Sequence, residues 1–432
     1  MKRILYNSLL VWKSSKRRKP LLLQGARQVG KTYLVNQFGK SEYKDFIYLN
    51  FEQQPTLNTL FSEDLSPQKI INNIGLYLGR KIVPEDTLLF FDEVQAVPQV
   101  LTSLKYFYEQ SPEYHIIAAG SLLGVSVGKE NSFPVGKVNF MTLFPMSFIE
   151  YLTAFGEELL VEKLINLQQI EAFPEIIHNK LLTHLKTYMF LGGMPEILQD
   201  YKLNNDIASV REIQNEILEA YQRDFSKYTN KSQAIKTSEV WSSIPWQLAK
   251  EKKKFKYAEI SKYSRSSTYE QSIEWLNRAG LINITNNISV PKLPLSGYID
   301  NLKFKIYLLD TGLLGAMLKL SSALIIEPTG LFSEYNGAFT ENFVASELVA
   351  GGADQLFYWT SNNEAEVDFI IEKENEIYPL EVKSGLNRNL KSLRSYADKY
   401  KPKLMYRLSP RNFVQSDDFI NLPLYAISLL FK

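Results

Sequence analysis

The stretch GARQVGKT (residues 25–32) stands between the apolar run LLLQ and a segment with helical periodicity. It satisfies the spacing G-x-x-x-x-G-K-[ST], which forms a phosphate-binding loop when it joins a strand to a helix. In such a loop the backbone N–H groups turn inward around phosphate oxygens at the positive end of the helix, and glycines permit that backbone. The predicted nucleotide cradle consists of Gly25, Ala26, Arg27, Gln28, Val29, Gly30, Lys31 and Thr32.

Two residues of this cradle have predicted chemical roles. Lys31 is expected to hold the β- and γ-phosphates of ATP, and the hydroxyl of Thr32 to bind Mg²⁺. The alternative, a glycine-rich turn with a surface lysine, explains neither the strand before the loop nor the helix after it. ATP and Mg²⁺ are therefore the predicted cofactors.

A second apolar run, LLFFDE at residues 88–93, ends in two carboxylates. Asp92 is expected to hold Mg²⁺ through its coordination shell, and Glu93 to polarise the attacking water as the general base. The alternative is that the two acids cap the helix that follows. Ser121 ends the next apolar run and is a candidate γ-phosphate sensor or a helix cap. Transition-state charge usually also needs an arginine, and the unranked candidates are Arg27, Arg223 and Arg265.

Short apolar runs alternate with helical stretches through the first third of the chain. Alternation of this kind indicates an α/β domain with a parallel sheet that is covered on both faces. The runs occupy residues 21–25, 46–51, 87–93, 115–121 and 138–144. A helical region then extends to about residue 217, broken by LGGMPE at 191–196, and we interpret it as a helical lid. The predicted ATPase domain spans residues 1–230.

The order helix, short helix, helix and two strands predicts a winged-helix domain at residues 231–330. Gly280 fits a helix C-terminus, and Asn286–Asn287 is expected to turn between the strands. Candidate nucleic-acid contacts are Ser266, Ser267, Thr268, Gln271, Lys252 to Lys254 and Lys262. The alternative is a spacer, because the third helix also carries the core-like residues Ile273, Trp275, Leu276 and Leu281.

The chain of 432 residues contains no cysteine and has a formal net charge of +2. The absence of cysteine excludes disulfides and thiolate chemistry and favours a cytoplasmic location. Residues 1–19 lack the apolar core of a signal peptide, and no apolar run could span a bilayer, so we expect no membrane contact. So small a charge leaves nucleic-acid binding to local patches, such as residues 13–19 and 250–256. Homo-oligomer formation is left open.

Several phrases along the chain together resemble one family. They are GARQVGKT, FFDEVQ, GSLLG, LFPMSFIEYL and YMFLGGMPE, followed by IYLLDTGLLGAML, GAFTENFVASEL, AEVDFII and PLEVKSG. They are similar to prokaryotic predicted ATPases of the AAA+ superfamily that carry a C-terminal domain of unknown function, DUF4143. That domain is in turn similar to PD-(D/E)xK nucleases. The resemblance implies an ATP-dependent machine that acts on nucleic acid, with DNA as the expected partner, and a nuclease-like α/β domain at residues 331–432.

Within this last domain Asp368, Glu381 and Lys383 match the D…(D/E)xK pattern, and Glu341 matches the acid of the preceding helix. A hairpin that turns at Glu374–Asn375 would place Asp368 opposite Glu381, with Lys383 on the same face. Mg²⁺ held by Asp368, Glu381 and Glu341 could then orient a water beside Lys383 for phosphodiester attack.

Other interpretations of this hairpin stay open. In the same register Glu366 opposes Lys383, so the lysine could form an exposed ion pair, and Pro379 argues for an edge or bulged strand. The C-terminal domain either cleaves nucleic acid, binds it or another partner without cleavage, or is only structural. The leading hypothesis is an Mg²⁺-dependent ATPase that acts on DNA, and the alternative is a nucleotide-switched interaction protein.

Overall fold

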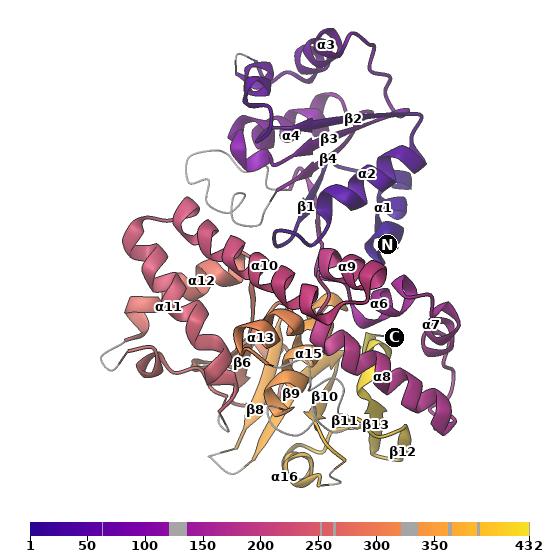
Figure 1. The fold of residues 1–432 in the computed structure, drawn as a ribbon, viewed down its shortest axis with the longest axis vertical. Coiled ribbons are helices and arrows are strands. Elements are labelled where there is room, and N and C mark those ends of the chain that lie inside the picture. Colours follow the sequence, from indigo (N-terminus) through magenta and orange to yellow (C-terminus); the bar gives the residue numbers. More distant parts are fainter. Residues whose placement is uncertain are drawn as a thin grey trace. The chain divides into compact units, whose positions relative to one another are not determined.

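The computed structural model describes the whole chain except residues 63, 121–135, 251–252, 262–264, 321–335, 362–364, 387–388 and 432. The chain forms two compact units (Figure 1). The first comprises residues 1–144 with the short segment 278–280, and the second comprises residues 145–277 and 281–432. None of the described helices combines the length and the apolar character that crossing a membrane requires.

The first unit is built on a five-stranded parallel sheet with the order β2-β3-β4-β1-β5. Its strands are β1 (Leu21–Gln24), β2 (Asp45–Asn50), β3 (Thr87–Asp92), β4 (His115–Ala119) and β5 (Asn139–Thr142). Its helices are α1 (Leu5–Ser14), α2 (Lys31–Glu42), α3 (Pro67–Leu78) and α4 (Pro98–Gln110). Every residue of β3 and β4 is buried, as continuous apolar strands in a covered parallel sheet should be. The prediction of an α/β fold is confirmed.

From residue 145 to residue 278 the described chain is mainly helical, and further helices lie between the strands of the C-terminal part. The helices are α6 (Phe148–Ala154), α7 (Glu158–Ile165), α8 (Glu175–Leu191), α9 (Pro195–Asn204), α10 (Ile207–Tyr228), α11 (Lys231–Leu248), α12 (Ser266–Arg278), α13 (Thr311–Met317), α15 (Asn336–Ala350) and α16 (Lys391–Tyr400). The predicted break falls between α8 and α9. A short 3₁₀ helix, η3 (Tyr257–Glu259), lies between α11 and α12, so the helix order predicted for a winged helix is present.

An eight-stranded mixed sheet follows, with the order β12-β13-β11-β10-β9-β8-β6-β7. Its strands are β6 (Ile282–Ile288), β7 (Ile299–Leu308), β8 (Leu356–Thr360), β9 (Glu366–Lys373), β10 (Glu376–Val382), β11 (Met405–Ser409), β12 (Val414–Ser416) and β13 (Phe419–Pro423). Strand β6 pairs with β7 antiparallel and with β8 parallel, so the segment predicted to hold both wing strands is a single strand that continues the C-terminal sheet.

The three predicted domains stay a prediction, and the two compact units divide the chain at another place. The first boundary falls after Phe144, because α8 and α10 pack against α13 and thereby join the helical region to the C-terminal part. The turn predicted at Asn286–Asn287 is wrong, since both residues lie within β6 at a bulge. The Asn287 amide is buried there and donates to the Thr360 hydroxyl at 3.2 Å, which stabilises a polar residue inside the strand.

The glycine break at LGGMPE packs onto the segment LLDTGLLG. The Asp310 carboxylate accepts the Gly193 N–H at 2.6 Å and, as the N-cap of α13, the Leu313 N–H at 2.9 Å. Gly192 has φ 76° and ψ −170°, a backbone region that is essentially restricted to glycine. A Cβ atom on Gly192 would lie 2.1 Å from Asp310 Oδ1. The same Asp310 carboxylate therefore stabilises both the glycine break and the start of α13.

Gly192→Ala should lower the free energy of unfolding of the second unit by about 2 to 4 kcal/mol, from backbone strain and from the contact with Asp310. Urea unfolding followed by tryptophan fluorescence measures this, since every tryptophan except Trp12 lies beyond residue 144. Gly297→Ala is the matched control, because a Cβ atom there meets nothing within 4 Å. Equal stability of the two variants would contradict this account of the glycine break.

Candidate functional site

The loop GARQVGKT wraps around the start of α2 with the backbone that a phosphate cradle needs. Gly25 has φ 153°, and a Cβ atom there would lie 2.3 Å from the carbonyl oxygen of Leu143. Gln28 has φ 65°, and Gly30, at φ 93°, is the N-cap of α2. No side chain caps this N-terminus, so its first N–H groups keep their positive potential for an anion.

The Lys31 side chain lies across this loop. Its ammonium donates to the carbonyl oxygens of Gly25 at 3.0 Å and Ala26 at 2.8 Å. Burial lowers the pKa of Lys31 to about 8, against the opposing effect of the Glu93 and Asp92 carboxylates. Among the described residues, the hydrogen bonds of this ammonium group go to neutral carbonyl oxygens of the loop.

Thr32 and Asp92 meet at the carboxyl ends of the central strands. The Thr32 hydroxyl donates to Asp92 Oδ2 at 2.8 Å, and the Tyr48 hydroxyl donates to the same oxygen at 3.1 Å. Burial raises the pKa of Asp92. Hydroxyl and carboxylate oxygens are ligands that Mg²⁺ prefers, so these residues fit the ion that the loop implies. Sequence reasoning missed Tyr48, whose only signal is its position near the end of the strand beside β3.

Glu93 follows β3 directly and has a left-handed backbone, with φ 54°. Its side chain makes no cap hydrogen bond to the 3₁₀ turn Val94–Ala96, and it accepts a hydrogen bond from the Gln95 amide. Helix α4 begins only at Pro98, with Val97 as its N-cap. The capping alternative for this acid is therefore not what the structure has. A non-glycine residue in this strained region is typical of functional sites.

Arg3 is a buried residue of this unit that sequence reasoning missed. Its guanidinium donates to the carbonyl oxygens of Val29, inside the loop, at 2.8 Å and of Phe144 at 2.6 Å. Arg3 therefore anchors the backbone of the phosphate loop at Val29. No local motif could have revealed Arg3, because the partners lie 26 and 141 residues away.

The other predicted residues of the nucleotide site are not assigned a role by the described contacts. Ser121 lies outside the described residues. Arg223 is exposed and pairs with Glu219 at 3.1 Å on α10, and Arg265 is exposed just before α12. The arginine that transition-state charge requires stays unassigned.

The hairpin of β9 and β10 has the predicted geometry. Glu374 and Asn375 form the turn with φ 53° and 63°, and Leu380 pairs with Phe369, so Asp368 and Glu381 are the next opposed pair. The predicted edge strand is wrong, because β10 lies between β9 and β11. Pairing with β11 begins only at Leu380, one residue after Pro379, which leaves the proline outside that ladder.

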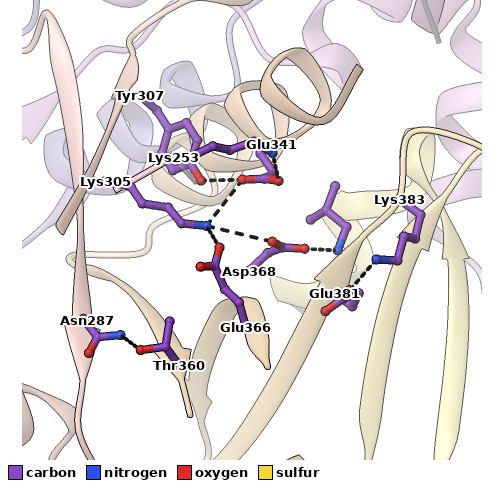
Figure 2. Close-up of polar contacts among 11 residues, drawn as sticks. Lys253, Asn287, Lys305, Tyr307, Glu341, Thr360, Glu366, Asp368, Glu381 and Lys383 are labelled. Atoms are coloured by element: carbon purple, nitrogen blue, oxygen red, sulfur yellow. Dashed lines mark hydrogen bonds and ion pairs between the residues drawn. The ribbon is translucent and has the colours of Figure 1, made fainter. Parts of the chain in front are cut away.

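The acids of this hairpin face lysines (Figure 2). Lys305 of β7 lies 2.5 Å from Glu366, 3.5 Å from Glu341 and 3.9 Å from Asp368. Lys253 forms a second, very close ion pair with Glu341. No ion pair joins Lys383 to Glu366 among the described residues; Lys383 follows β10 directly and lies 2.5 Å from Glu381 of that strand.

Burial and these lysines set the charges of the cluster. Burial opposes ionisation of Glu341, yet Lys253 and Lys305 lower its pKa to about 2. Burial, together with Glu341 and Glu381, raises the pKa of Asp368 well above its usual range. Burial disfavours the Lys305 ammonium, but the carboxylates around it raise its pKa well above the usual range.

The fit of a divalent cation is poorer here than at Thr32 and Asp92. Both Glu341 oxygens are already bonded, Oε1 to Lys253 and Oε2 to the Tyr307 hydroxyl at 2.8 Å. Within the described parts of the chain, no cluster of three or more His, Cys, Asp or Glu side chains is arranged to hold a metal ion. The metal site at Glu341, Asp368 and Glu381, with Lys383 beside it, stays a prediction. Nothing local predicted Lys253 or Lys305, which come from elements distant in sequence.

The candidate recognition helix is α12. Ser266, Ser267 and Gln271 are exposed at its start, and Thr268 is half-buried. Lys252 and Lys262 lie outside the described residues, and Lys253 is engaged with Glu341. Ile273 and Leu276 form the buried face of the helix.

A P-loop in a five-stranded parallel sheet, with Thr32 bonded to the acid of β3, has the architecture of a P-loop nucleotide-binding fold. Residues 17–152 match the family model described as AAA domain. Residues 182–324 match a domain of unknown function, DUF8612, and residues 336–427 match the domain of unknown function DUF4143. The predicted combination of an N-terminal AAA match and a C-terminal DUF4143 match is confirmed, and the likeness of the latter to nucleases stays a prediction.

No curated protein matches the chain in sequence. Among solved structures it is similar to the Orc1 protein of Aeropyrum pernix in complex with DNA, with 12% identity, a TM-score of 0.29 and coverage of 73% of this chain and 90% of that one. AMPPCP-bound DnaA from Aquifex aeolicus shows 16% identity, a TM-score of 0.25 and coverage of 63% and 86%. Cdc6p from Pyrobaculum aerophilum shows 12% identity, a TM-score of 0.25 and coverage of 74% and 95%. At these TM-scores the likeness carries no inference about function.

Arg3→Met should weaken nucleotide affinity about five- to thirtyfold, because the loop loses charged hydrogen bonds that are together worth about 1 to 2 kcal/mol. Titration with a fluorescent ATP analogue measures this. Lys2→Met is the control, since Lys2 is exposed. Unchanged affinity in a folded Arg3→Met protein would show that the loop keeps its shape without this contact.

Proposed function

We propose that this protein is an Mg²⁺-dependent ATPase whose nucleotide cycle is coupled to its winged-helix and nuclease-like parts, and that it acts on DNA. The observation that carries the ATPase proposal is the contact between Thr32 and Asp92, at 2.8 Å, beside Lys31. This contact joins the phosphate loop to the acidic strand, and a phosphate-binding loop alone would not require it.

The residues of the chain have separate roles in this proposal. The loop N–H groups and Lys31 hold the phosphates, after Lys31 exchanges its carbonyl partners for phosphate oxygens. Thr32 and Asp92 would hold Mg²⁺, which supplies charge neutralisation on the β- and γ-phosphates. Glu93, placed just beyond β3, orients the attacking water and accepts its proton.

DNA is the proposed partner because the start of α12 presents exposed polar side chains and because the C-terminal domain resembles nucleases. The lysines around Glu341 and Asp368 favour a C-terminal part that binds without cleaving. The second candidate function is therefore a nucleotide-switched interaction protein, in which ATP changes partner affinity and turnover is slow.

Glu93→Gln should reduce ATP turnover at least about a hundredfold while nucleotide binding is kept, because only the general base is lost. Lys31→Ala should lose both binding and turnover. A coupled assay of phosphate release, with and without duplex DNA, measures these effects, and DNA should stimulate only the wild type. Lys40→Ala is the control, since Lys40 is exposed at the end of α2.

DNA-independent, near-zero turnover of a tightly held nucleotide would reject the ATPase proposal and favour the nucleotide-switched interaction protein. Turnover without any DNA effect would keep the ATPase and remove DNA as the partner.

Incubation of the wild type with single- and double-stranded DNA and RNA, in Mg²⁺ or Mn²⁺, should show no cleavage. The physical reason is that the Glu341 oxygens are occupied by Lys253 and Tyr307. Gel electrophoresis of labelled substrates measures this. Cutting that survives Lys31→Ala and disappears in Asp368→Ala would instead establish nuclease activity at this hairpin.

A further inference from the structure

The acidic cluster of the second unit contains Glu341, Glu366, Asp368 and Glu381, and three lysines meet it (Figure 2). We propose that Lys305 is a permanent built-in cation of this cluster and that Lys253 is a removable plug, which keeps a divalent metal ion out while it is in place. This proposal goes beyond ATP hydrolysis and does not depend on it.

Lys305 is permanent because of where it lies. Its side chain is 0% exposed and comes from β7, a strand of the continuous sheet. It is within ion-pair distance of Glu341, Glu366 and Asp368, which come from α15 and β9. Removal of such a cation would leave buried carboxylates without compensation, which is strongly destabilising.

Lys253 is more accessible than Lys305, although its ion pair with Glu341 is the closer of the two. Its side chain is 13% exposed and comes from the segment between α11 and η3, not from a regular element. The Phe255 N–H donates to the carbonyl oxygen of Phe304 at 2.9 Å, which brings this segment alongside β7. The lysine can therefore leave the cluster without unpairing the sheet.

Gly337 makes the room that Lys253 occupies. A Cβ atom on Gly337 would lie 2.7 Å from Lys253 Nζ and 3.9 Å from Glu341 Oε1. An alanine there would crowd the Lys253 ammonium and force it to shift, without changing any charge of the cluster. Gly337→Ala is thus a charge-neutral way to disturb the plug, whereas Lys253→Met removes its ammonium group.

The oxygens left behind suit a hard cation. Without Lys253, Glu341 Oε1 loses its partner, and Glu381 Oε2 is already buried with no hydrogen-bond partner among the described residues. Carboxylate oxygens in that state are costly to keep buried unless a cation joins them. The opened cluster is therefore expected to bind one divalent ion.

Binding of Mn²⁺ to the full-length protein without nucleotide, followed by electron paramagnetic resonance, tests the proposal. The wild type should bind no Mn²⁺ at this cluster up to about 1 mM, whereas Gly337→Ala and Lys253→Met should each bind one ion at least about tenfold more tightly. Addition of Asp368→Asn to either variant should abolish that ion. Lys256→Met, an exposed lysine of the same segment, is the control and should behave as the wild type.

Two results would overturn the proposal. One is a wild-type Mn²⁺ ion that disappears in Asp368→Asn, since the lysines would then not exclude metal. The other is folded Gly337→Ala and Lys253→Met proteins, as judged by circular dichroism, that bind no ion. Neither result bears on ATP turnover, which is measured separately with Lys31→Ala and Glu93→Gln.

Discussion

The buried Asp310 carboxylate joins the glycine break after α8 to the start of α13 within the second unit. Its two oxygens accept N–H groups from Gly193 and Leu313, and the bond to Gly193 joins segments 117 residues apart. Burial raises the pKa of Asp310 to about 6, and these N–H donors oppose the rise. The Gln214 amide donates to the carbonyl oxygens of Phe190 and Leu191 at 2.9 and 3.1 Å, so the end of α8 is satisfied as well. A buried acid is tolerated here because each of its oxygens has a donor.

A second buried acid, Glu347, joins the helical region to the segment that matches DUF4143. Glu347 of α15 accepts the Phe148 N–H at 2.8 Å and the Tyr188 hydroxyl at 3.3 Å, and burial raises its pKa to about 7. The chain leaves the first unit at Phe144, whose carbonyl oxygen Arg3 holds, and enters these contacts within a few residues. The Arg3 side chain thus contacts both the phosphate loop, at Val29, and Phe144, where the first unit ends. The helical region packs with the C-terminal part of the chain because buried polar groups of the two parts form hydrogen bonds with each other.

Sequence reasoning succeeded where the determining pattern is local. The phosphate loop, the strand that ends in Asp92 and the register of the β9–β10 hairpin depend on spacing within one motif or around one turn, and the structure has all three. It failed where a polar residue is stabilised by a distant partner. Asn287 was expected in a turn because asparagine favours turns, but its bond to Thr360 keeps it in a strand. Lys253 and Lys305 reach the cluster from elements whose pairing no spacing encodes.

The two sites use lysine in opposite ways, and the partners of each ammonium group show why. Lys31 is bonded to neutral carbonyl oxygens, and a phosphate oxygen with its negative charge is the stronger acceptor, so a nucleotide can take this lysine over. Lys305 is surrounded by three carboxylates in a buried position, and no incoming anion offers it a better environment. The first lysine is therefore available for binding, and the second is bound to the fold. Lys253 lies between these cases, with one carboxylate partner and partial exposure, so its removal costs the structure less than the removal of Lys305 would.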